Sequence, residues 1–354
     1  MKPIILTVAE LALALVFAAG CQSDQAQKHA GVSRDAMPAR IFPTLGRIER
    51  LDSAFDALIP PDVVIEKLAE GFDWSEGPVW VRAGGYLLFS DVPRNVVLKW
   101  QEDAGVSEFL KPSGYTGQTA RGGEPGSNGL TLDAQGRLVL CQHGDRRVAR
   151  LESNDDFRTL AGSYRQRRFN SPNDLVVKSN GDLYFTDPPY GLEGLNDSPK
   201  KELMFNGVFR ISAGGAVTLL TDALTFPNGL AFSPDERTLY VAVSDPQRPV
   251  IMAYDVKADG NLAQGRVFFD AAPLAKDKDR KGLPDGLKVD EAGNLFATGP
   301  GGVLVISPDG KLLGILNTGE ATANCAWGND GSVLYLTADM YLCRVRTGTR
   351  GRIP

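Results

Sequence analysis

Residues 171–187 read SPNDLVVKSNGDLYFTD, and this stretch decides the fold because versions of it recur along the chain. A polar residue is followed by a short apolar run, a turn of Ser, Asn, Gly and Asp, and a second apolar run, which is the pattern of a β-hairpin. The pattern occurs six times at intervals of 39 to 57 residues, and its leading polar residues are Glu76, Asn128, Asn173, Asn228, Asp285 and Asn324.

A hairpin repeat with this spacing is typical of propeller blades. We therefore predict an all-β, six-bladed β-propeller, in which the six leading residues, called the axial residues below, converge at one end of the central channel. A third apolar run follows the hairpin in several copies, at 97–100, 148–151, 208–211 and 303–306.

The last copy lacks an outer strand after Cys343–Arg346, whereas VVIEKL at Val63–Leu68 precedes the first copy without a partner. We predict that Val63–Leu68 completes the sixth blade and closes the ring, because closure removes two exposed sheet edges. The propeller then forms one domain over residues 61–350.

Composition excludes some classes of partner. The chain has 354 residues, 43% hydrophobic content and a formal net charge of −5. A nucleic-acid surface is not expected, because the longest basic run is RQRR at 165–168 and such a short run is typical of a solvated loop.

The N-terminal region is predicted to lie outside the propeller. Lys2, an apolar stretch and the small residues Ala18–Gly20 before Cys21 resemble a bacterial lipoprotein signal over residues 1–21, with an ordinary secretory signal as the alternative. Residues 22–60 are predicted to be a flexible tether and lead-in. We expect an exported, periplasmic protein whose contact with the membrane is a lipid on Cys21, and Gln22 resembles the pattern of outer-membrane sorting.

Three cysteines remain in the body of the chain, at positions 141, 325 and 343. Cys325 and Cys343 fall on strands two apart in the last blade, a separation of about 9–10 Å that no disulfide spans. We predict three buried free thiols.

The axial residues supply two carboxylates and four amides, and this oxygen-only set suits a hard cation. Ca²⁺ takes six to eight oxygen ligands in irregular geometry, and Zn²⁺, Mn²⁺ or Mg²⁺ could stand in its place. A zinc site built on several histidines is excluded, because His143 is the one histidine of the predicted propeller. For any single axial Asn or Asp, a cap on a local turn is the simpler interpretation.

Four motifs, SEGPVW, SPND, FPNGL and LPDGL, resemble in their order the metal-ligand motifs of the senescence-marker/gluconolactonase/luciferin-regenerating family. SNGLTLDAQGRLVLCQHGDRRV and TDPPYGL are most similar to its bacterial gluconolactonase branch. The resemblance implies a calcium-dependent propeller with lactonase activity, in which Glu76, Asn173, Asn228 and Asp285 hold the metal and Asp285 is also the general base.

Other residues are candidates for substrate binding. Residues about fifteen positions after each axial residue should lie on the same face, and His143 is one of them, suited to proton transfer or to a hydrogen bond with substrate; a loop-capping histidine is the alternative. Asn128 is assigned to the pocket, Tyr190 in DPPYGL to its wall, and Asn324 to a structural role. Arg121 is a candidate for contact with a polyol or carboxylate, or is simply solvated.

Lactone hydrolysis needs a polarised carbonyl and a carboxylate that accepts a proton from water. A phosphotriesterase with the same metal site is the alternative among enzymes, and a ligand-binding propeller without catalysis is the alternative outside them. The expected partner is a small-molecule lactone, and the sequence does not indicate an oligomeric state.

Overall fold

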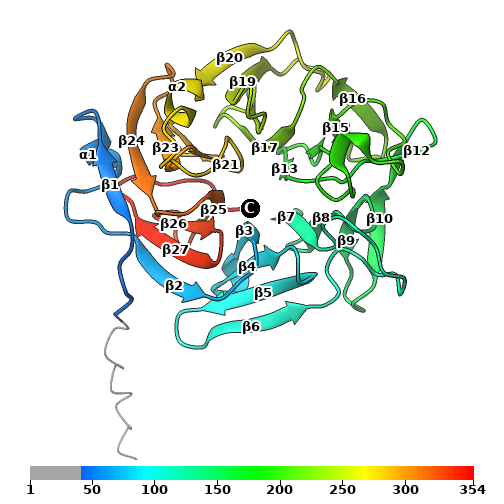
Figure 1. Cartoon of the computed structure of the whole chain (residues 1–354), viewed down its shortest axis with the longest axis horizontal. Coiled ribbons are helices and arrows are strands. Elements are labelled where there is room, and N and C mark those ends of the chain that lie inside the picture. The colour runs from blue at the N-terminus through cyan, green and yellow to red at the C-terminus, as the bar shows by residue number, and fades with distance from the viewer. Residues whose placement is uncertain (1–40) are drawn as a thin grey trace, which may run out of the picture. The chain divides into compact units, whose positions relative to one another are not determined.

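The computed structural model describes residues 41–354, which form six antiparallel sheets arranged in a ring around a central axis (Figure 1). The predicted six-bladed all-β propeller is confirmed. The predicted signal peptide and residues 22–40 lie outside the described residues. Within residues 41–354, no helix combines the length and the apolar character needed to cross a membrane.

Each blade is a meander whose first strand lies nearest the axis. Blade 1 contains β3 (Ser75–Val81), β4 (Tyr86–Asp91), β5 (Val96–Gln101) and β6 (Gly105–Leu110). Blade 2 contains β7 (Ser127–Leu132), β8 (Leu138–Gln142), β9 (Arg147–Leu151) and β10 (Phe157–Ala161). Blade 3 contains β13 (Leu175–Val177), β14 (Leu183–Asp187), β15 (Gly207–Ile211) and β16 (Val217–Thr221).

The second half of the ring repeats this order. Blade 4 contains β17 (Pro227–Phe232), β18 (Thr238–Val243), β19 (Val250–Asp255) and β20 (Arg266–Asp270). Blade 5 contains β21 (Leu287–Val289), β22 (Leu295–Gly299), β23 (Gly302–Ile306) and β24 (Leu312–Asn317). Blade 6 contains β25 (Thr322–Gly328), β26 (Val333–Ala338) and β27 (Tyr341–Arg346). The four third-strand runs predicted from the sequence agree with β5, β9, β15 and β23 to within one residue at each end.

The ring is closed by β2 (Glu66–Glu70), which pairs antiparallel with β27 as the outer strand of blade 6. The predicted closure is confirmed, with the strand displaced toward the C-terminus relative to Val63–Leu68. The buried Arg344 of β27 anchors this seam, since its Nε donates to Glu66 and its guanidinium lies 5.8 Å from the centroid of the Trp100 ring in blade 1. Closure therefore joins the last blade to the first.

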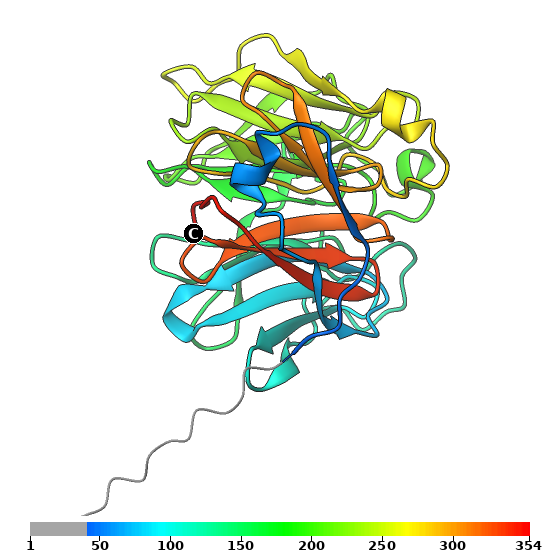
Figure 2. The ribbon, with the colours of Figure 1, turned by 90° about the vertical axis from the view of Figure 1, so that its left-hand side faces the viewer.

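A further N-terminal strand, β1 (Arg47–Arg50), pairs with β24 and makes blade 5 five-stranded. The short helix α1 (Phe55–Leu58) follows, with Phe55 and Ile59 fully buried beside blades 5 and 6. Figure 2 shows this blue segment crossing the outside of the ring. Residues 47–58 thus pack on the propeller, although they lie within the predicted flexible tether and lead-in of residues 22–60.

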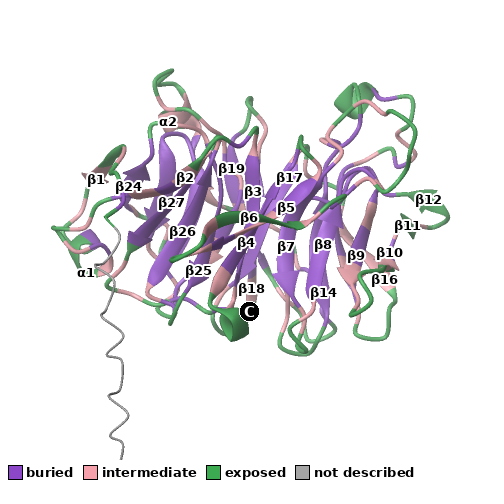
Figure 3. Cartoon of the chain, turned by 90° about the horizontal axis from the view of Figure 1, so that it is seen from below, coloured by how far each residue is buried: buried purple, intermediate pink, exposed green. Residues whose placement is uncertain are grey.

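The remaining elements are short and lie in the connections. They are η1 (Arg82–Gly84), the small hairpin β11 (Ser163–Tyr164) with β12 (Arg167–Arg168), η2 (Leu195–Asp197) and α2 (Ala272–Ala275). The connection that carries α2 lies on the face that is uppermost in Figure 3. The C-terminus lies on the opposite, lower face.

Glycines after the axial residues let neighbouring blades approach closely. A Cβ added to Gly229 would lie 2.3 Å from the carbonyl oxygen of Asp285 in the next blade, and one added to Gly129 would lie 2.7 Å from the carbonyl oxygen of Asn173. Hydroxyls complete this contact, because Thr186 donates to the carbonyl of Asn228 at 2.7 Å. The backbone around the channel is therefore fixed by direct contact between blades.

The three predicted free thiols, Cys141, Cys325 and Cys343, are unpaired and buried in the structure. Burial raises the pKa of the Cys343 thiol to about 12. These thiols pack as small apolar side chains, and the described propeller is held together without disulfides.

Candidate active site

Side chains of the axial residues meet at the channel, as the repeat predicted. Those of blades 2, 3 and 4 form a directional chain of amides. Asn128 Nδ2 donates to Asn173 Oδ1 at 3.0 Å, and Asn173 Nδ2 donates to Asn228 Oδ1. Asn228 Nδ2 then donates to the Ser244 hydroxyl at 2.9 Å, which donates to the carbonyl of Pro284. The chain thus leads to the residue before Asp285 and sets the orientation of every amide in it.

The other side of the channel holds carboxylates. Glu76 is buried, and its Oε2 accepts hydrogen bonds from the backbone N–H of Gly77 at 2.8 Å and from Asn324 Nδ2 at 3.3 Å. The same Asn324 nitrogen lies 3.3 Å from Oδ2 of the buried Asp174. One amide therefore bridges two carboxylates of different blades.

Burial and mutual repulsion disfavour the ionised forms of these acids. Burial raises the pKa of Glu76 to about 8, and the charges of Asp174 and Glu124 add to the increase. Burial raises the pKa of Asp285 well above its ordinary value, and the charges of Glu76, Asp174 and Glu124 act in the same direction. The charged groups that shift these two pKa values are all carboxylates.

Two oxygens at the channel lack a donor. Asp285 Oδ1 and Asn128 Oδ1 are out of contact with solvent and have no hydrogen-bond partner. A buried acceptor without a partner costs about 1–3 kcal/mol, so a water or a bound ion at these two oxygens would be stabilising.

A divalent cation fits this arrangement. Its charge would offset the repulsion between Glu76 and Asp285, and it would supply a partner for the unsatisfied oxygens. Within residues 41–354, no three His, Cys, Asp or Glu side chains cluster as a metal site by themselves. The candidate set therefore depends on the amide oxygens of Asn173 and Asn228, and oxygen-only ligation of this kind suits Ca²⁺.

Asp174 belongs to this cluster and was not predicted from the sequence. Four of the six axial residues are followed by Gly, at positions 77, 129, 229 and 286, whereas Asn173 is followed by Asp174. A carboxylate at a position where the repeat has glycine was a signal of a side chain in the channel.

His143 lies where the spacing placed it, on the same face as the axial residues. Its side chain has 0% exposure, its Nε2 lies 3.1 Å from Asn173 Oδ1, and its Nδ1 lies 3.0 Å from Glu124 Oε2. Glu124 was also missed from the sequence, because its partner lies nineteen residues away on a different loop. His143 thus connects a candidate ligand to a carboxylate nearer the solvent.

Arg121 makes its hydrogen bonds to backbone. Its guanidinium donates to the carbonyl of His143 at 3.3 Å and to the carbonyl of Gly191, and it lies 5.5 Å from the centroid of the Tyr115 ring. These contacts tie the loop of residues 112–126 to the loop of residues 188–206. Arg121 therefore holds backbone carbonyls of two loops beside the site.

Tyr190, predicted to line the pocket wall, lies beside the axial Asn228. Its ring stacks on Phe226 with centroids 6.0 Å apart, and its hydroxyl lies near Ser244 and Asn228. Burial and the nearby charge of Asp285 raise the pKa of Tyr190 above its ordinary value. The hydroxyl stays protonated at neutral pH and can donate a hydrogen bond within the site.

Asp91 and Asp187, which also follow axial residues by about fifteen positions, accept hydrogen bonds from backbone N–H groups. Asp187 Oδ2 and Oδ1 accept the N–H groups of Asn170 and Ser171, each at 2.8 Å, and Asp91 accepts those of Asp73 and Trp74. Burial raises the pKa of Asp187 to about 7. These residues shape the loops that lead into the axial positions.

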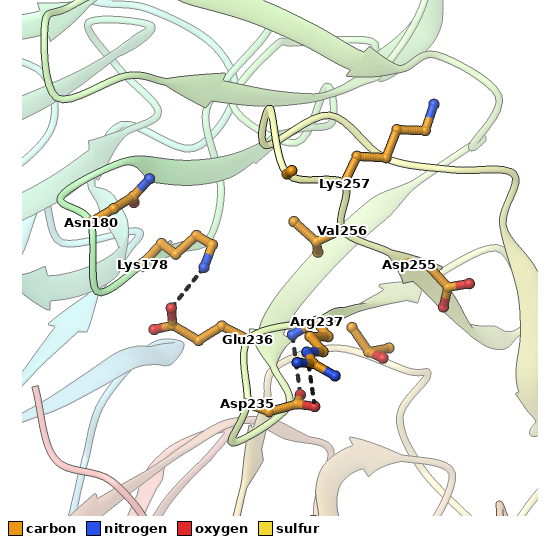
Figure 4. Close-up of a pocket in the computed structure, with 10 residues that line it drawn as sticks. Lys178, Asn180, Asp235, Glu236, Arg237, Asp255, Val256 and Lys257 are labelled. Atoms are coloured by element: carbon orange, nitrogen blue, oxygen red, sulfur yellow. Dashed lines mark hydrogen bonds and ion pairs between the residues drawn. The ribbon is translucent and has the colours of Figure 1, made fainter.

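A cavity of about 620 Å³ lies elsewhere, between the turns that join the first two strands of blades 3 and 4 (Figure 4). Lys178 Nζ donates to Glu236 at 2.8 Å, and the backbone N–H of Arg237 donates to Asp235 at 3.1 Å. Lys178 and Glu236 thus form an ion pair at the edge of this cavity, and the acids of the channel do not line it.

The chain is similar to known lactonases. Residues 74–339 match the family described as SMP-30/Gluconolactonase/LRE-like region. The gluconolactonase of Zymomonas mobilis is 42% identical over 87% of this chain and 88% of its own length. The solved structure of a gluconolactonase from Xanthomonas campestris superposes with a TM-score of 0.75 at 34% identity, covering 88% of this chain and 98% of that one. A calcium-binding regucalcin from Agrobacterium tumefaciens, at 18% identity and a TM-score of 0.64, shares the fold.

Proposed function

This chain belongs to the SMP-30/gluconolactonase/LRE-like family and is a lactonase, and we propose that it is a metal-dependent hydrolase of sugar lactones. The observation that carries the metal dependence is the closeness of two acids, the buried Glu76 and the half-buried Asp285 with its buried Oδ1, whose pKa values are raised by desolvation and by further carboxylates. An uncompensated pair of this kind needs a cation if both acids are to ionise at neutral pH.

Glu76, Asn173, Asn228 and Asp285 would hold the ion, and Ca²⁺ is the proposed species because all four offer oxygen. When bound, the ion would polarise the lactone carbonyl as a Lewis acid. The amide chain from Asn128 to Ser244 would keep the ligand oxygens in place before the ion arrives, which limits the reorganisation that binding requires.

The protein's own residues would supply the proton transfers. Asp285 would accept a proton from the water whose oxygen forms the new bond to the carbonyl carbon. The bond between that carbon and the ring oxygen then breaks, and the ring oxygen takes up a proton to become a hydroxyl of the aldonic acid. Tyr190 would orient the substrate through its protonated hydroxyl, and His143 would serve as a secondary hydrogen-bond or proton partner.

A hydrolysis panel tests this proposal. Gluconolactone, other aldonolactones, a homoserine lactone and an organophosphate are each assayed before and after removal of metal with EGTA, and again after Ca²⁺ is restored. We expect aldonolactone hydrolysis that EGTA abolishes and Ca²⁺ restores. Activity that survives complete chelation would refute the metal requirement, and cleavage of the organophosphate alone would favour the phosphotriesterase alternative.

Export is a separate proposal, supported by the sequence pattern around Cys21. Labelled fatty acid should be incorporated into the wild-type protein expressed in a Gram-negative host and not into Cys21→Ser. Equal labelling of the two proteins would contradict lipidation at this residue.

A further inference from the structure

The carboxylate of Glu124 lies nearer the solvent than the buried acids of the channel. Its Oε2 lies 3.0 Å from Nδ1 of His143, and Nε2 of the same ring lies 3.1 Å from Asn173 Oδ1. A single imidazole therefore separates Glu124 from a proposed metal ligand. The His143 side chain has 0% exposure and that of Glu124 has 40%, so Glu124 is the member of this row that an arriving ligand meets first.

The loop around Glu124 is held against the rest of the site. Arg121 donates to backbone carbonyls on either side of it, at His143 and Gly191. A Cβ added to Gly123 would lie 2.6 Å from the carbonyl oxygen of Gly191, so the two loops are in direct contact there. The backbone beside Glu124 is therefore held in place, and its carboxylate contacts His143.

Carboxylates gather at this end of the channel. Glu76, Asp174 and Asp285 lie close enough to influence one another, and Glu124 is a fourth carboxylate whose charge acts on Glu76 and Asp285. The guanidinium of Arg121, bound to the carbonyls of His143 and Gly191, is the cation beside Glu124. One divalent cation compensates two of these charges. The influence of Glu124 reaches Glu76, Asp285 and Tyr190, so its charge acts across the whole site.

We propose that Glu124 is a specificity-determining residue that favours uncharged lactones and repels lactones bearing a phosphate or carboxylate. This inference rests on the proposed lactonase function and concerns the same site. Like charges placed close together discriminate against the wrong ligand without improving the fit of the right one. Hydrolysis also turns a neutral lactone into a carboxylate, so the same repulsion favours release of the product.

The test compares gluconolactone with its 6-phosphorylated counterpart, each with Ca²⁺ present. We expect the wild-type kcat/KM to be higher for the neutral lactone than for the phosphorylated one. Glu124→Gln should reduce the ratio of these two kcat/KM values by about tenfold, because Gln keeps a side chain of the same shape while removing the charge. The inhibition constants of gluconate and 6-phosphogluconate give a second readout. The affinity for 6-phosphogluconate should increase more on substitution than the affinity for gluconate.

Glu193→Gln is the matched control. Its carboxylate lies on the same face, so close to Gly122 that an added Cβ would be 2.1 Å from it, but the residue is exposed and no contact joins it to His143. If Glu193→Gln narrows the ratio as much as Glu124→Gln, overall charge is responsible and the proposal fails. It also fails if the wild type prefers the phosphorylated lactone, or if neither the ratio nor the inhibition constants respond to Glu124→Gln. A wild type that hydrolyses neither lactone would overturn the proposed function itself.

Discussion

The side-chain nitrogen of Asn324 lies 3.3 Å from Oε2 of Glu76, across the boundary between the last blade and the first. The same nitrogen lies 3.3 Å from Oδ2 of Asp174, on the other side of the channel. Asn324 Oδ1 is occupied by the backbone N–H of Cys325 at 2.9 Å, which fixes the amide so that its nitrogen faces the acids. Asn324 therefore offers one N–H donor group to two buried carboxylates.

Replacing Asn324 with Leu should destabilise the protein. Glu76 and Asp174 would lose their shared donor while staying buried, and we expect the free energy of unfolding at pH 7 without metal to fall by about 1–3 kcal/mol. Urea unfolding with EGTA present measures this loss. Asn324→Gln, which retains an amide on a longer side chain, should recover part of the loss; a Leu variant as stable as the wild type would show that the bridge contributes little.

The metal-free protein should become less stable as the pH rises. The folded-state pKa of Glu76 is raised to about 8, chiefly by burial, whereas the unfolded value is about 4.3. The contribution of Glu76 to the free energy of unfolding is therefore complete when the pH is below its unfolded-state pKa, and it is lost as the pH rises through its folded-state pKa. The free energy of unfolding should fall by up to about 1.4 kcal/mol per pH unit from this group.

Calcium should reverse this trend, because it binds the ionised carboxylates and stabilises the folded state by mass action. The calcium-induced increase in Tm, measured by calorimetry, should therefore be larger at pH 8 than at pH 5. Glu76→Gln is the control and should show a smaller dependence on pH. An increase in Tm that is greatest at pH 5 would contradict the proposed ligand set.

Asp285→Asn should separate metal binding from catalysis. The substituted side chain keeps an oxygen ligand but cannot accept a proton, so kcat for an aldonolactone should fall by roughly 10²–10⁴-fold. Calorimetric titration should still detect bound Ca²⁺. His143→Gln should lower kcat less. If Asp285→Asn binds calcium and keeps near-normal turnover, Asp285 is not the general base, and Glu76 is the first residue to test in its place.

Gly229→Ala should disturb the contact between blades 4 and 5. The added methyl group would lie 2.3 Å from the carbonyl oxygen of Asp285 and 2.6 Å from the Cα of Gly286, so the backbone beside the site must move. We expect a loss of about 1–3 kcal/mol in the free energy of unfolding, together with weaker calcium binding. Gly162→Ala, whose nearest neighbours would be 3.7 Å away, is the control and should change neither quantity measurably.

Arg344→Met should weaken the seam that closes the ring. Glu66 and Glu102 would both lose their partner in β27, and we expect unfolding in urea to require about 1–3 kcal/mol less. The loss is below that of a fully buried pair because both acids have some contact with water. Arg266→Met removes the exposed ion pair with Asp255 and should cost less than about 0.5 kcal/mol. If the free energy of unfolding falls equally in the two variants, Arg344 does not stabilise the seam more than an exposed ion pair stabilises the surface.

The parts of this structure that follow a repeat could be predicted from the sequence, and the parts that depend on contacts between loops could not. The axial residues and the hairpins follow from the spacing of the repeat. β1 was missed because its sequence, RIER, has one apolar residue and gives no alternation. Its position is set by pairing with β24, which is distant in sequence. Glu124 was missed for a similar reason, since its role depends on a fold that brings His143 beside it.

The pairing of β2 with β27 also constrains the order in which the protein can form. β2 ends at residue 70 and β27 begins at residue 341, so on the ribosome one strand of this pair is synthesised long before the other. Until then the nascent chain has an open sheet at each end, and open edges of this kind associate readily with other chains. Contacts between such distant segments also slow folding. The yield of active protein during synthesis should therefore depend on how well the unfinished ring is protected from other nascent chains.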